Sequence, residues 1–460
     1  MRWRLALGWV LVPIAIGSAL PAAAPARAGR DRLNILLVIS DDLNTDLGCY
    51  GHPVVRSPHV DRLARRGLRF TRAYCQYPVC NPSRTSFLTG LRPDRTGILD
   101  NRTPYRTRLP EAMTLPRLFR RNGYVTAALG KVFHDGAEFN DPEGWDLIRT
   151  PTGTPRGRQG EGRSLAPYPW CRWVAAEGDD SDQPDGQIAD EAIRFLAQPR
   201  DRPFFLAVGF HRPHDPFINP RRYLELYPLD RLRPPVDPPD RSPEVPGAIP
   251  TSYRFDFTDQ DRREFMRAYY AGISMMDAQL GRLLAALEQQ RLADRTLVIF
   301  IGDHGYHVGE RGWWNKNTLF ERSARVPMIV AGPGVPRGRT CDRLVELVDL
   351  YATLSDLCRL PPPPDGEGIS LRPLLRDPAR PWKSAAFTQV QRGRIAGRSL
   401  RTERWRYTEW GEEGPVELYD HATDPGEYRN LATDPAHAAI RAQLRERLRA
   451  GWRAALPPGG

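Results

Sequence analysis

The stretch Cys80-Asn-Pro-Ser-Arg84 combines a nucleophilic side chain with a site for a negatively charged group. Asn81 can cap a helix and Pro82 suits its first position, so the stretch predicts that Cys80 lies at a helix N-terminus. Free backbone N–H groups and the helix dipole favour an anion there, and Arg84 lies on the same face. Cys80 can be a packed thiol, half of a disulfide or a nucleophile, and an anionic substrate beside it would be well held.

Three carboxylates follow apolar segments and suit a hard cation. Asp41 and Asp42 come just after an apolar run that ends at Ile39, and Asp303 follows the run TLVIFIG. Adjacent carboxylates repel each other, and a bound cation relieves that repulsion. Carboxylate oxygens are the ligands that Ca²⁺ and Mg²⁺ prefer. We therefore expect one divalent cation, Ca²⁺ or Mg²⁺, at this place; the alternative is that Asp41 and Asp42 cap a turn.

Lysine is rare enough in this chain to be informative. Of the 66 Lys and Arg residues only three are Lys, namely Lys131, Lys316 and Lys383. Because this sequence uses Arg wherever any cation serves, a retained Lys indicates a place that needs a compact ammonium group. Lys131 and Lys316 lie in stretches with other ionisable residues. Lys383 belongs to no motif, and we predict that it lies on the surface.

Histidines complete the set of candidate groups. His134 lies in GKVFH, His211 and His214 lie in HRPH, and His304 lies in GDHG. A histidine that titrates near neutrality can transfer protons. A lone loop histidine is more commonly held by structural contacts, and this is our interpretation of His214.

These polar residues share a position, because each group follows a short apolar run with the length of a buried strand. The runs are LNILLVIS, YVTAALG, PFFLAVGF and TLVIFIG. Helical stretches between them predict a central mixed, mostly parallel sheet flanked by helices. In such α/β proteins, sites form beyond the carboxyl ends of the strands. We therefore expect the four runs to deliver their polar residues to one edge of the sheet.

The remaining pattern predicts a large domain and a small one. Helices are predicted over residues 57–70, 265–290 and 342–358. Loops or linkers rich in Gly and Pro are predicted at 151–185, 232–250 and 360–368. After about residue 379, SLRTERWRYTEW and VELYDHATDP are typical of an antiparallel hairpin. We predict an α/β catalytic domain at 29–378 and a C-terminal α+β subdomain with a small antiparallel sheet at 379–460.

The first 28 residues have the layout of a secretory signal peptide. Arg2 and Arg4 precede an apolar run, and an Ala-rich stretch follows, with Ala26 and Ala28 at a cleavage site. We predict an exported protein, periplasmic or secreted, with no membrane span after cleavage; an uncleaved anchor is the alternative. Export permits disulfides, but the spacing of the six cysteines fixes no pairing.

The net charge of +11 favours polyanionic partners, although a general preference for Arg accounts for it equally well. No nucleic-acid partner is predicted.

The stretch CNPSRTSFLTG resembles the signature of the type I sulfatases, which belong to the alkaline-phosphatase-like superfamily. Further stretches, in the same order, are similar to the iduronate-2-sulfatase group: SDDLNTDLGCYG, VRSPHVDRLA, GKVFH, FFLAVGFHRPHDPF, YYAGISMMDAQLGRLL, DHGYHVGERGWWNK and VELVDLYATL. One short motif arises by chance, but an ordered series does not. The resemblance covers most of residues 31–430 and implies the sulfatase-like α/β fold.

The resemblance also implies a chemical modification of Cys80. In this family the signature cysteine is oxidised to formylglycine (3-oxoalanine), so a formylglycine-generating enzyme is implied as a maturation partner. The aldehyde hydrates to a gem-diol, and one hydroxyl attacks sulfur and releases the alcohol. The other hydroxyl is then deprotonated and expels sulfate. An unmodified cysteine or serine cannot expel sulfate by that route, because it lacks the second hydroxyl.

Roles for single residues follow from the resemblance. The implied metal ligands are Asp41, Asp42, Cys80, Asp303 and His304. His304 stands where many sulfatases have Asn, and a hydrogen bond to the sulfate is the alternative for this residue. The groups implied to bind or neutralise the sulfate are Arg84, Lys131, His211 and Lys316. His134 would take the proton of the gem-diol, and His211 would donate one to the leaving alcohol.

The implied function is removal of a 2-O-sulfate from a terminal iduronate, or a similar uronic acid, of a glycosaminoglycan-type glycan. Tyr306-His307 departs from the group's Trp and small residue, and 151–185 shows no match, so we expect sugar contacts at these places. Alternatives are a sulfatase for another sugar or for aryl or choline sulfate, a phosphate mono- or diesterase of the same fold, and a non-catalytic sulfoglycan-binding protein. The cysteine in the pattern C-x-P-S-R argues against the phosphate mono- or diesterase.

Overall fold

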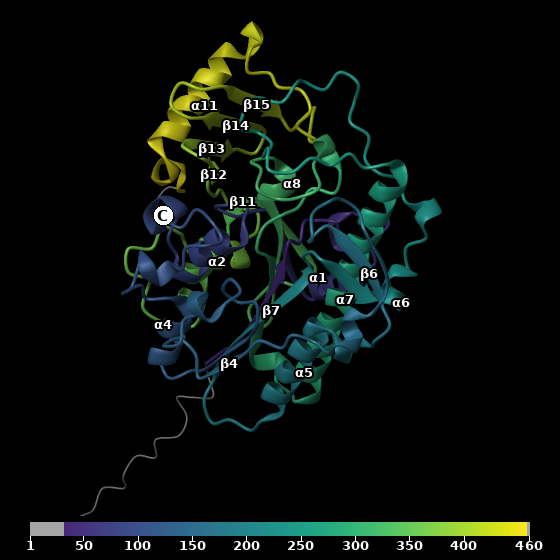
Figure 1. The fold of residues 1–460 in the computed structure, drawn as a ribbon. Helices are drawn as coiled ribbons and strands as arrows, with labels where there is room; N and C mark the ends of the chain where they lie inside the picture. The colour runs from purple at the N-terminus through teal and green to yellow at the C-terminus, as the bar shows by residue number, and fades with distance from the viewer. Residues whose placement is uncertain (1–31, 458–460) are drawn as a thin grey trace, which may run out of the picture.

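The computed structural model describes residues 32–457, so the predicted signal peptide lies outside the described residues. An eight-stranded sheet runs through the centre of the molecule (Figure 1). Across the sheet its strands are β11 (Arg339–Glu346), β2 (Gly67–Tyr74), β10 (Arg325–Ala331), β9 (Thr296–Gly302), β1 (Asn34–Asp41), β7 (Phe204–Pro213), β3 (Val125–Gly130) and β4 (Leu147–Arg149). The predicted mixed sheet is confirmed.

The four strands predicted from apolar runs lie side by side in this sheet. β1 pairs in parallel with β9 on one side and β7 on the other, and β3 pairs in parallel with β7. Every residue of β1 is buried, as a central parallel strand requires. The carboxyl ends of all four strands therefore meet at one edge.

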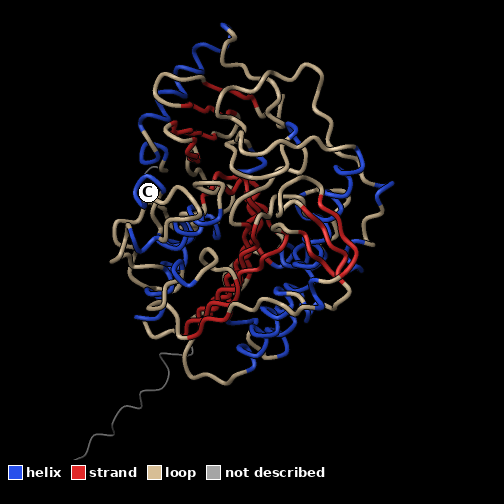
Figure 2. Tube along the Cα trace, viewed as in Figure 1, coloured by secondary structure: helices blue, strands red, loops and turns tan. Residues whose placement is uncertain are grey.

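Helices cover both faces of the sheet, and Figure 2 shows its strands between them. Leu36 and Val38 of β1 point into the core on one face, and Ile35 and Leu37 point into the core on the other. The first face is covered by α1 (Pro58–Arg66), α5 (Pro184–Ala197) and α7 (Asp259–Gln289). The second is covered by α2 (Cys80–Thr89), α4 (Leu115–Arg121), α9 (Asp349–Leu357) and α10 (Arg372–Arg376). Short helices elsewhere are α3 (Pro93–Thr96), α6 (Arg221–Leu224) and α8 (Glu321–Ala324).

Three local predictions need correction. The helix predicted over 57–70 ends at Arg66, and its last four residues belong to β2. The segment 342–358 is not one helix, because its first residues belong to the strand β11, and α9 follows. Pairing of β11 with β2 overrides the local helical pattern. The segment 151–185 is not only loop: β5 (Gly160–Ser164) and β6 (Arg172–Ala176) form a three-stranded sheet with β8 (Phe217–Pro220). The long helix predicted at 265–290 is confirmed as part of α7, and 232–250 contains neither helix nor strand.

The C-terminal segments form a separate four-stranded antiparallel sheet, as predicted. It consists of β12 (Ala386–Arg392), β13 (Ile395–Arg401), β14 (Trp405–Trp410) and β15 (Val416–Asp420), and α11 (Ala438–Ala450) packs against it. It lies at the yellow end of the molecule in Figure 1. The exact domain boundary at 378/379 stays a prediction.

Lys383 is buried, so its predicted surface position is wrong. Its ammonium nitrogen lies 2.8 Å from Glu346 Oε2 and 2.6 Å from Asp349 Oδ1. Glu346 ends β11 and Asp349 begins α9, whereas Lys383 just precedes β12. The ion pair therefore connects the central sheet to the C-terminal sheet.

All six cysteines are free in the described part of the chain, so no disulfide forms there. Within residues 32–457, no helix is both long and apolar enough to cross a membrane.

Lys383→Met tests the ion pair that connects the central sheet to the C-terminal sheet. We expect the free energy of unfolding to fall by about 3 kcal/mol or more, because Asp349 is left buried without its cation and Glu346 keeps only Arg92. Chemical denaturation measures the change. Arg394→Gln, at an exposed position, is the control and should change stability by less than about 0.5 kcal/mol. Equal effects of the two variants would contradict the assignment.

Candidate active site

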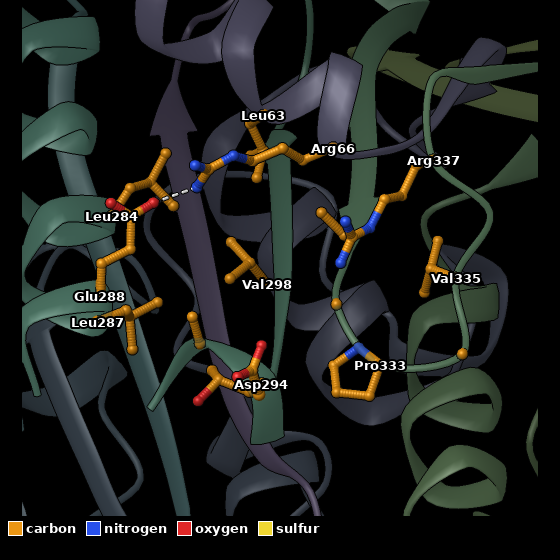
Figure 3. Close-up of a pocket in the computed structure, with 15 residues that line it drawn as sticks. Leu63, Arg66, Leu284, Leu287, Glu288, Asp294, Val298, Pro333, Val335 and Arg337 are labelled. Atoms are coloured by element: carbon orange, nitrogen blue, oxygen red, sulfur yellow. Dashed lines mark hydrogen bonds and ion pairs between the residues drawn. The ribbon is translucent and has the colours of Figure 1, made fainter. Parts of the chain in front are cut away.

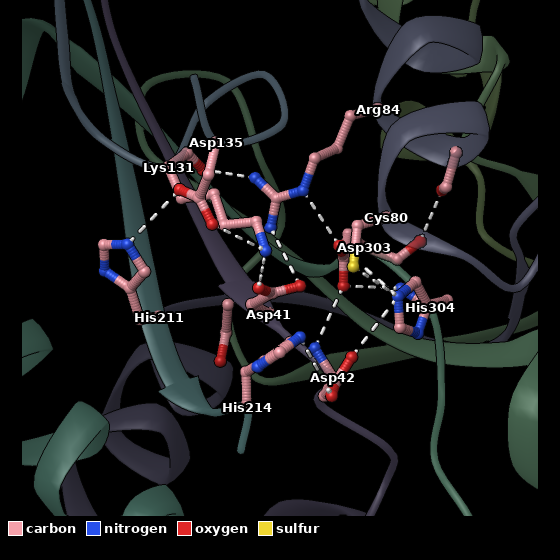
Figure 4. A network of polar contacts seen from close by, with 12 residues as sticks. Asp41, Asp42, Cys80, Arg84, Lys131, Asp135, His211, His214, Asp303 and His304 are labelled. Atoms are coloured by element: carbon pink, nitrogen blue, oxygen red, sulfur yellow. Dashed lines mark hydrogen bonds and ion pairs between the residues drawn. The ribbon is translucent and has the colours of Figure 1, made fainter. Parts of the chain in front are cut away.

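The carboxyl edge of the four parallel strands gathers the predicted polar residues. Asp41 is the last residue of β1, and Asp303 directly follows β9. Lys131 directly follows β3, and His211 lies near the end of β7. Figure 4 shows these side chains in one network of polar contacts, with Asp41 and Asp303 near Cys80 and with His211 farther away, beside Asp135. The sheet order thus brings residues from distant parts of the sequence into one cluster.

Cys80 is the first residue of α2 and is fully buried. The prediction of a helix N-terminus at this residue is confirmed, but the capping role of Asn81 is wrong. The helix begins two residues earlier than that, with Val79 at the N-cap and Cys80 as its first residue. The side-chain amide nitrogen of Asn81 instead donates to the carbonyl oxygens of Asp100 and Thr103, 2.8 Å away in each case.

Positive groups surround the thiol of Cys80. Lys316 Nζ lies 3.2 Å and His304 Nε2 3.4 Å from the sulfur. Burial and Asp41 raise the pKa of the thiol, but Lys131, Lys316 and His304 outweigh them and hold the pKa well below its usual value. This environment stabilises a negative charge at residue 80.

Asp41, Asp42, Cys80 and His304 each offer a ligand atom, and these atoms all lie within 4.8 Å of one another. Both carboxylate oxygens of Asp41, and Oδ2 of Asp42, are buried without a hydrogen-bond partner. Asp42 also has a φ of 62°, a conformation that costs energy and recurs at functional sites. Buried carboxylate oxygens that no hydrogen bond satisfies fit a divalent cation, so four of the five predicted ligands form a candidate cation site.

Asp303, the fifth predicted ligand, lies beside this group, and both of its carboxylate oxygens accept hydrogen bonds. One oxygen accepts from Arg84 Nε at 2.9 Å, and the other accepts from the backbone of Asp42 at 3.1 Å and of His304 at 2.9 Å. Burial raises the pKa of Asp303 to about 7 against the charges of His304 and Arg84. A nearby cation would restore its charged form.

Arg84 and Lys131 compensate the buried carboxylates. Arg84 Nη2 lies 3.4 Å from Asp41 Oδ1, and Arg84 Nη1 donates to the carbonyl oxygens of Lys131 and Val132. Lys131 Nζ lies 2.5 Å from Asp41 Oδ2. Burial raises the pKa of Asp41, but Lys131, His214 and Arg84 outweigh it and hold the pKa well below its usual range. Arg84 is fully buried and therefore acts mainly on these carboxylates.

His211 is held by Asp185, a residue that sequence reasoning missed. Asp185 lies at the start of α5 and accepts the backbone N–H groups of His211 and Arg212 at 2.8 and 2.9 Å. Its Oδ1 lies 3.4 Å from His211 Nδ1, and Asp135 Oδ1 lies 3.6 Å from His211 Nε2. Burial lowers the pKa of His211, but both carboxylates outweigh it and raise the pKa. No motif marked Asp185, because only the fold brings α5 beside β7.

The other two histidines of these stretches occupy different surroundings. His214 Nε2 lies 3.8 Å from Asp42 Oδ2, and its Nδ1 contacts the Asp215 carbonyl oxygen. His214 therefore faces the site as well as holding its turn, and Asp42 raises its pKa to about 10 against the effect of burial. His134 packs edge-on against Phe139, with ring centroids 4.9 Å apart, and its Nδ1 is buried without a partner.

Tyr306 and His307 do not line the site, so the expectation of sugar contacts there is wrong. Tyr306 is 1% exposed and stacks against Tyr269, with ring centroids 5.4 Å apart. His307 is fully buried and shares a 2.8 Å hydrogen bond with Thr318. Both side chains pack inside the loop that carries Lys316.

A separate cavity of about 580 Å³ lies at the other end of β9, beside Thr296 (Figure 3). Its lining includes Leu63, Arg66, Leu284 and Val298 and shares no residue with the polar cluster.

The Sulfatase family profile matches residues 33–360 of this chain. The chain belongs to the sulfatase family. A second profile, of the C-terminal region of N-sulphoglucosamine sulphohydrolase, matches residues 309–453 of this sulfatase.

The chain is similar to individual hydrolases that are named for different substrates. Iduronate 2-sulfatase of Mus musculus is 33% identical to this sulfatase, over 93% of this chain and 96% of the relative. A solved 2-O GAG sulfatase has a TM-score of 0.72 and 27% identity, covering 91% of each chain. The phosphonate monoester hydrolase of Agrobacterium radiobacter has a TM-score of 0.77 and 26% identity, covering 91% of this chain and 96% of that one.

Cation binding by the carboxylate cluster is testable without turnover. At a Ca²⁺ concentration about 100 times its Kd, we expect the free energy of unfolding to rise by about 2.7 kcal/mol, because the cation binds the folded state. Thermal unfolding with Ca²⁺ and with a chelator measures this change. Asp41→Asn should abolish the response, and Asp365→Asn, an exposed carboxylate outside the cluster, should keep it. A full response in Asp41→Asn would contradict the site.

Asp185→Asn should lower the pKa of His211 by about one unit, since one of two flanking charges is removed. Diethyl pyrocarbonate reacts with neutral imidazole, so the pH dependence of modification at His211, followed by peptide mass spectrometry, reports this pKa. The half-point should move to lower pH. Asp190→Asn, on the same helix but paired with Arg282, is the control and should leave it unchanged.

Proposed function

We propose that this sulfatase removes the 2-O-sulfate of a terminal iduronate or similar uronic acid in a glycosaminoglycan-type glycan. The observation that carries the proposal is the arrangement around Cys80, a residue at a helix N-terminus that lies beside Lys316 and His304 and shares a candidate cation site with Asp41 and Asp42. The sugar class rests on the similarity to iduronate 2-sulfatase and to the 2-O GAG sulfatase.

Two groups beyond the encoded side chains complete the proposal. Formylglycine at residue 80, made by a formylglycine-generating enzyme, would supply the hydrated aldehyde whose hydroxyl attacks sulfur. Ca²⁺ held by Asp41, Asp42, residue 80 and His304, with Asp303 adjacent, would supply positive charge to the sulfate oxygens.

The chain's own cations then bind the ester. Lys316 Nζ lies 3.2 Å from the sulfur of residue 80, and Lys131 Nζ lies against Asp41 of the candidate cation site, so both ammonium groups can approach a sulfate at residue 80. Neutralising charge on the transferring group is the main task of such a site. Arg84 contributes by holding Asp41 and Asp303 in place.

Proton transfer falls to histidines. The Asp185 carboxylate accepts the backbone N–H of His211 and lies 3.4 Å from its Nδ1, so Nε2 is our candidate to donate a proton to the departing alcohol oxygen. The raised pKa of His211 favours the protonated form that this step needs. His134 is our candidate for accepting the proton of the residue-80 hydrate. We also propose that the protein is exported, to the periplasm or the medium, where sulfated glycans are accessible.

A phosphorus ester is the second candidate substrate, because the fold is also similar to a phosphonate monoester hydrolase. A sulfoglycan-binding protein with unmodified Cys80 is the non-catalytic alternative. The mass of the peptide spanning residues 74–90 from the native host separates it from the enzyme, since an intact thiol would favour binding.

Release of sulfate from a disaccharide with a terminal 2-O-sulfated iduronate should be lost in Cys80→Ala, by a factor of about 10⁴ or more, because the nucleophile is removed. Ion chromatography of free sulfate measures it. Cys75→Ala, a buried thiol outside the cluster, is the matched control and should retain turnover. Faster release of phosphate from nitrophenyl phosphate than of sulfate from nitrophenyl sulfate would favour the second candidate.

A further inference from the structure

The carboxylate of Asp135 bridges two cationic groups of the site. Asp135 Oδ2 lies 3.3 Å from Lys131 Nζ, and Asp135 Oδ1 lies 3.6 Å from His211 Nε2. These nitrogens are the ones that the proposed function assigns to the sulfate and to the leaving oxygen. Figure 4 shows the Asp135 side chain between Lys131 and His211.

Asp135 is the solvent-facing member of this trio. Its side chain is 59% exposed, whereas that of Lys131 is 2% exposed and that of His211 is 28% exposed. An ester that reaches Lys131 and His211 from solvent therefore comes close to the Asp135 carboxylate. Asp135 contributes no atom to the group of four candidate metal ligands.

The carboxylate is charged throughout the neutral range. Burial raises the pKa of Asp135, but the neighbouring His211 and the charge of Lys131 outweigh it and hold the pKa below its usual range. Asp41 is the other acid that acts on Asp135, and Asp185 lies on the far side of His211. The entrance beside Lys131 thus carries a permanent negative charge.

A fixed negative charge penalises a doubly charged ester more than a singly charged one. A sulfate monoester carries one negative charge, whereas a phosphate monoester with a second pKa of about 6 carries nearly two above neutral pH. Both esters are tetrahedral and of similar size, so the extra charge is the main difference that the site can detect. The repulsion grows with each charge on the ligand.

We propose that Asp135 is a specificity-determining residue that selects singly charged sulfate esters against doubly charged phosphate monoesters. The proposal rests on the proposed function, since it assigns a filter to the same site. Asp135 acts through its charge and through its two cationic neighbours. It does not take part in bond making.

The test compares ester charge at about pH 8, where the phosphate monoester is a dianion. Three probes are used: nitrophenyl sulfate and bis-nitrophenyl phosphate, each with one charge, and nitrophenyl phosphate, with two. In Asp135→Asn, kcat/KM for nitrophenyl phosphate relative to nitrophenyl sulfate should rise about tenfold, the size of one weak charge–charge interaction in a partly solvated site. The ratio of the two singly charged probes should stay unchanged.

Two further variants separate charge from structure. Glu138→Gln neutralises a carboxylate of the same loop that makes no ion pair in the described chain, and it should leave all ratios unchanged. Asp135→Glu keeps the charge and should keep the wild-type selectivity. An equal change for all three probes in Asp135→Asn, or the same shift in Glu138→Gln, would overturn the proposal.

A binding measurement tests the role of Asp135 independently of catalysis. Calorimetry on protein with unconverted Cys80 compares inorganic sulfate, a dianion, with methyl sulfate, a monoanion. Asp135→Asn should tighten the binding of sulfate about tenfold more than that of methyl sulfate. Absence of turnover with every ester would reject the proposed function but leave this comparison intact, whereas unchanged relative affinities would reject the role of Asp135.

Discussion

Asp41, Asp42 and Asp303 are buried together at the carboxyl edge of the central sheet, and buried carboxylates keep their charge only where positive groups surround them. Arg84 spans Asp41 and Asp303, while Lys131 and Lys316 each lie against one carboxylate. This compensation is incomplete, because Asp42 Oδ2 is buried without a hydrogen-bond partner and the Asp41 oxygens are held only by their ion pairs. These oxygens destabilise the folded protein, and they also make the site fit a cation.

The compensating groups also set the reactivity of residue 80. A buried thiol ordinarily has a raised pKa, as Cys75 and Cys171 do. Cys80 has a lowered one because ammonium and imidazole groups are placed around it. The site therefore attracts anions before any modification of the cysteine, which is why binding and catalysis are separable properties in this protein.

The three lysines mark the places where this chain has a compact ammonium group in place of an arginine. Lys131, Lys316 and Lys383 all contact carboxylates in buried surroundings, at the site and between the two sheets. Arg84 and Arg92 show that buried arginines are also common here, each with two or more oxygen partners. A lysine is found where the cation is directed at one or two nearby oxygens without a planar fork.

The amino-acid sequence by itself determined the strands and the residues that follow them. Four apolar runs, each ending in ionisable residues, specify β1, β3, β7 and β9, because a fully buried strand needs a continuous apolar sequence. The start of α2 at Cys80 is likewise a local property, although Asn81 proved to hold a neighbouring loop instead of the helix.

Only the tertiary structure decided which further groups lie beside the residues that follow these strands. Asp185 and Asp135 reach His211 from α5 and from the loop after β3, and Lys383 finds Glu346 across two sheets. The strand β11 replaced a predicted helix because its pairing partner β2 lies far away in the sequence. Such contacts depend on the order of strands in the sheet and on long-range pairing, and neither leaves a mark in the spacing of nearby residues.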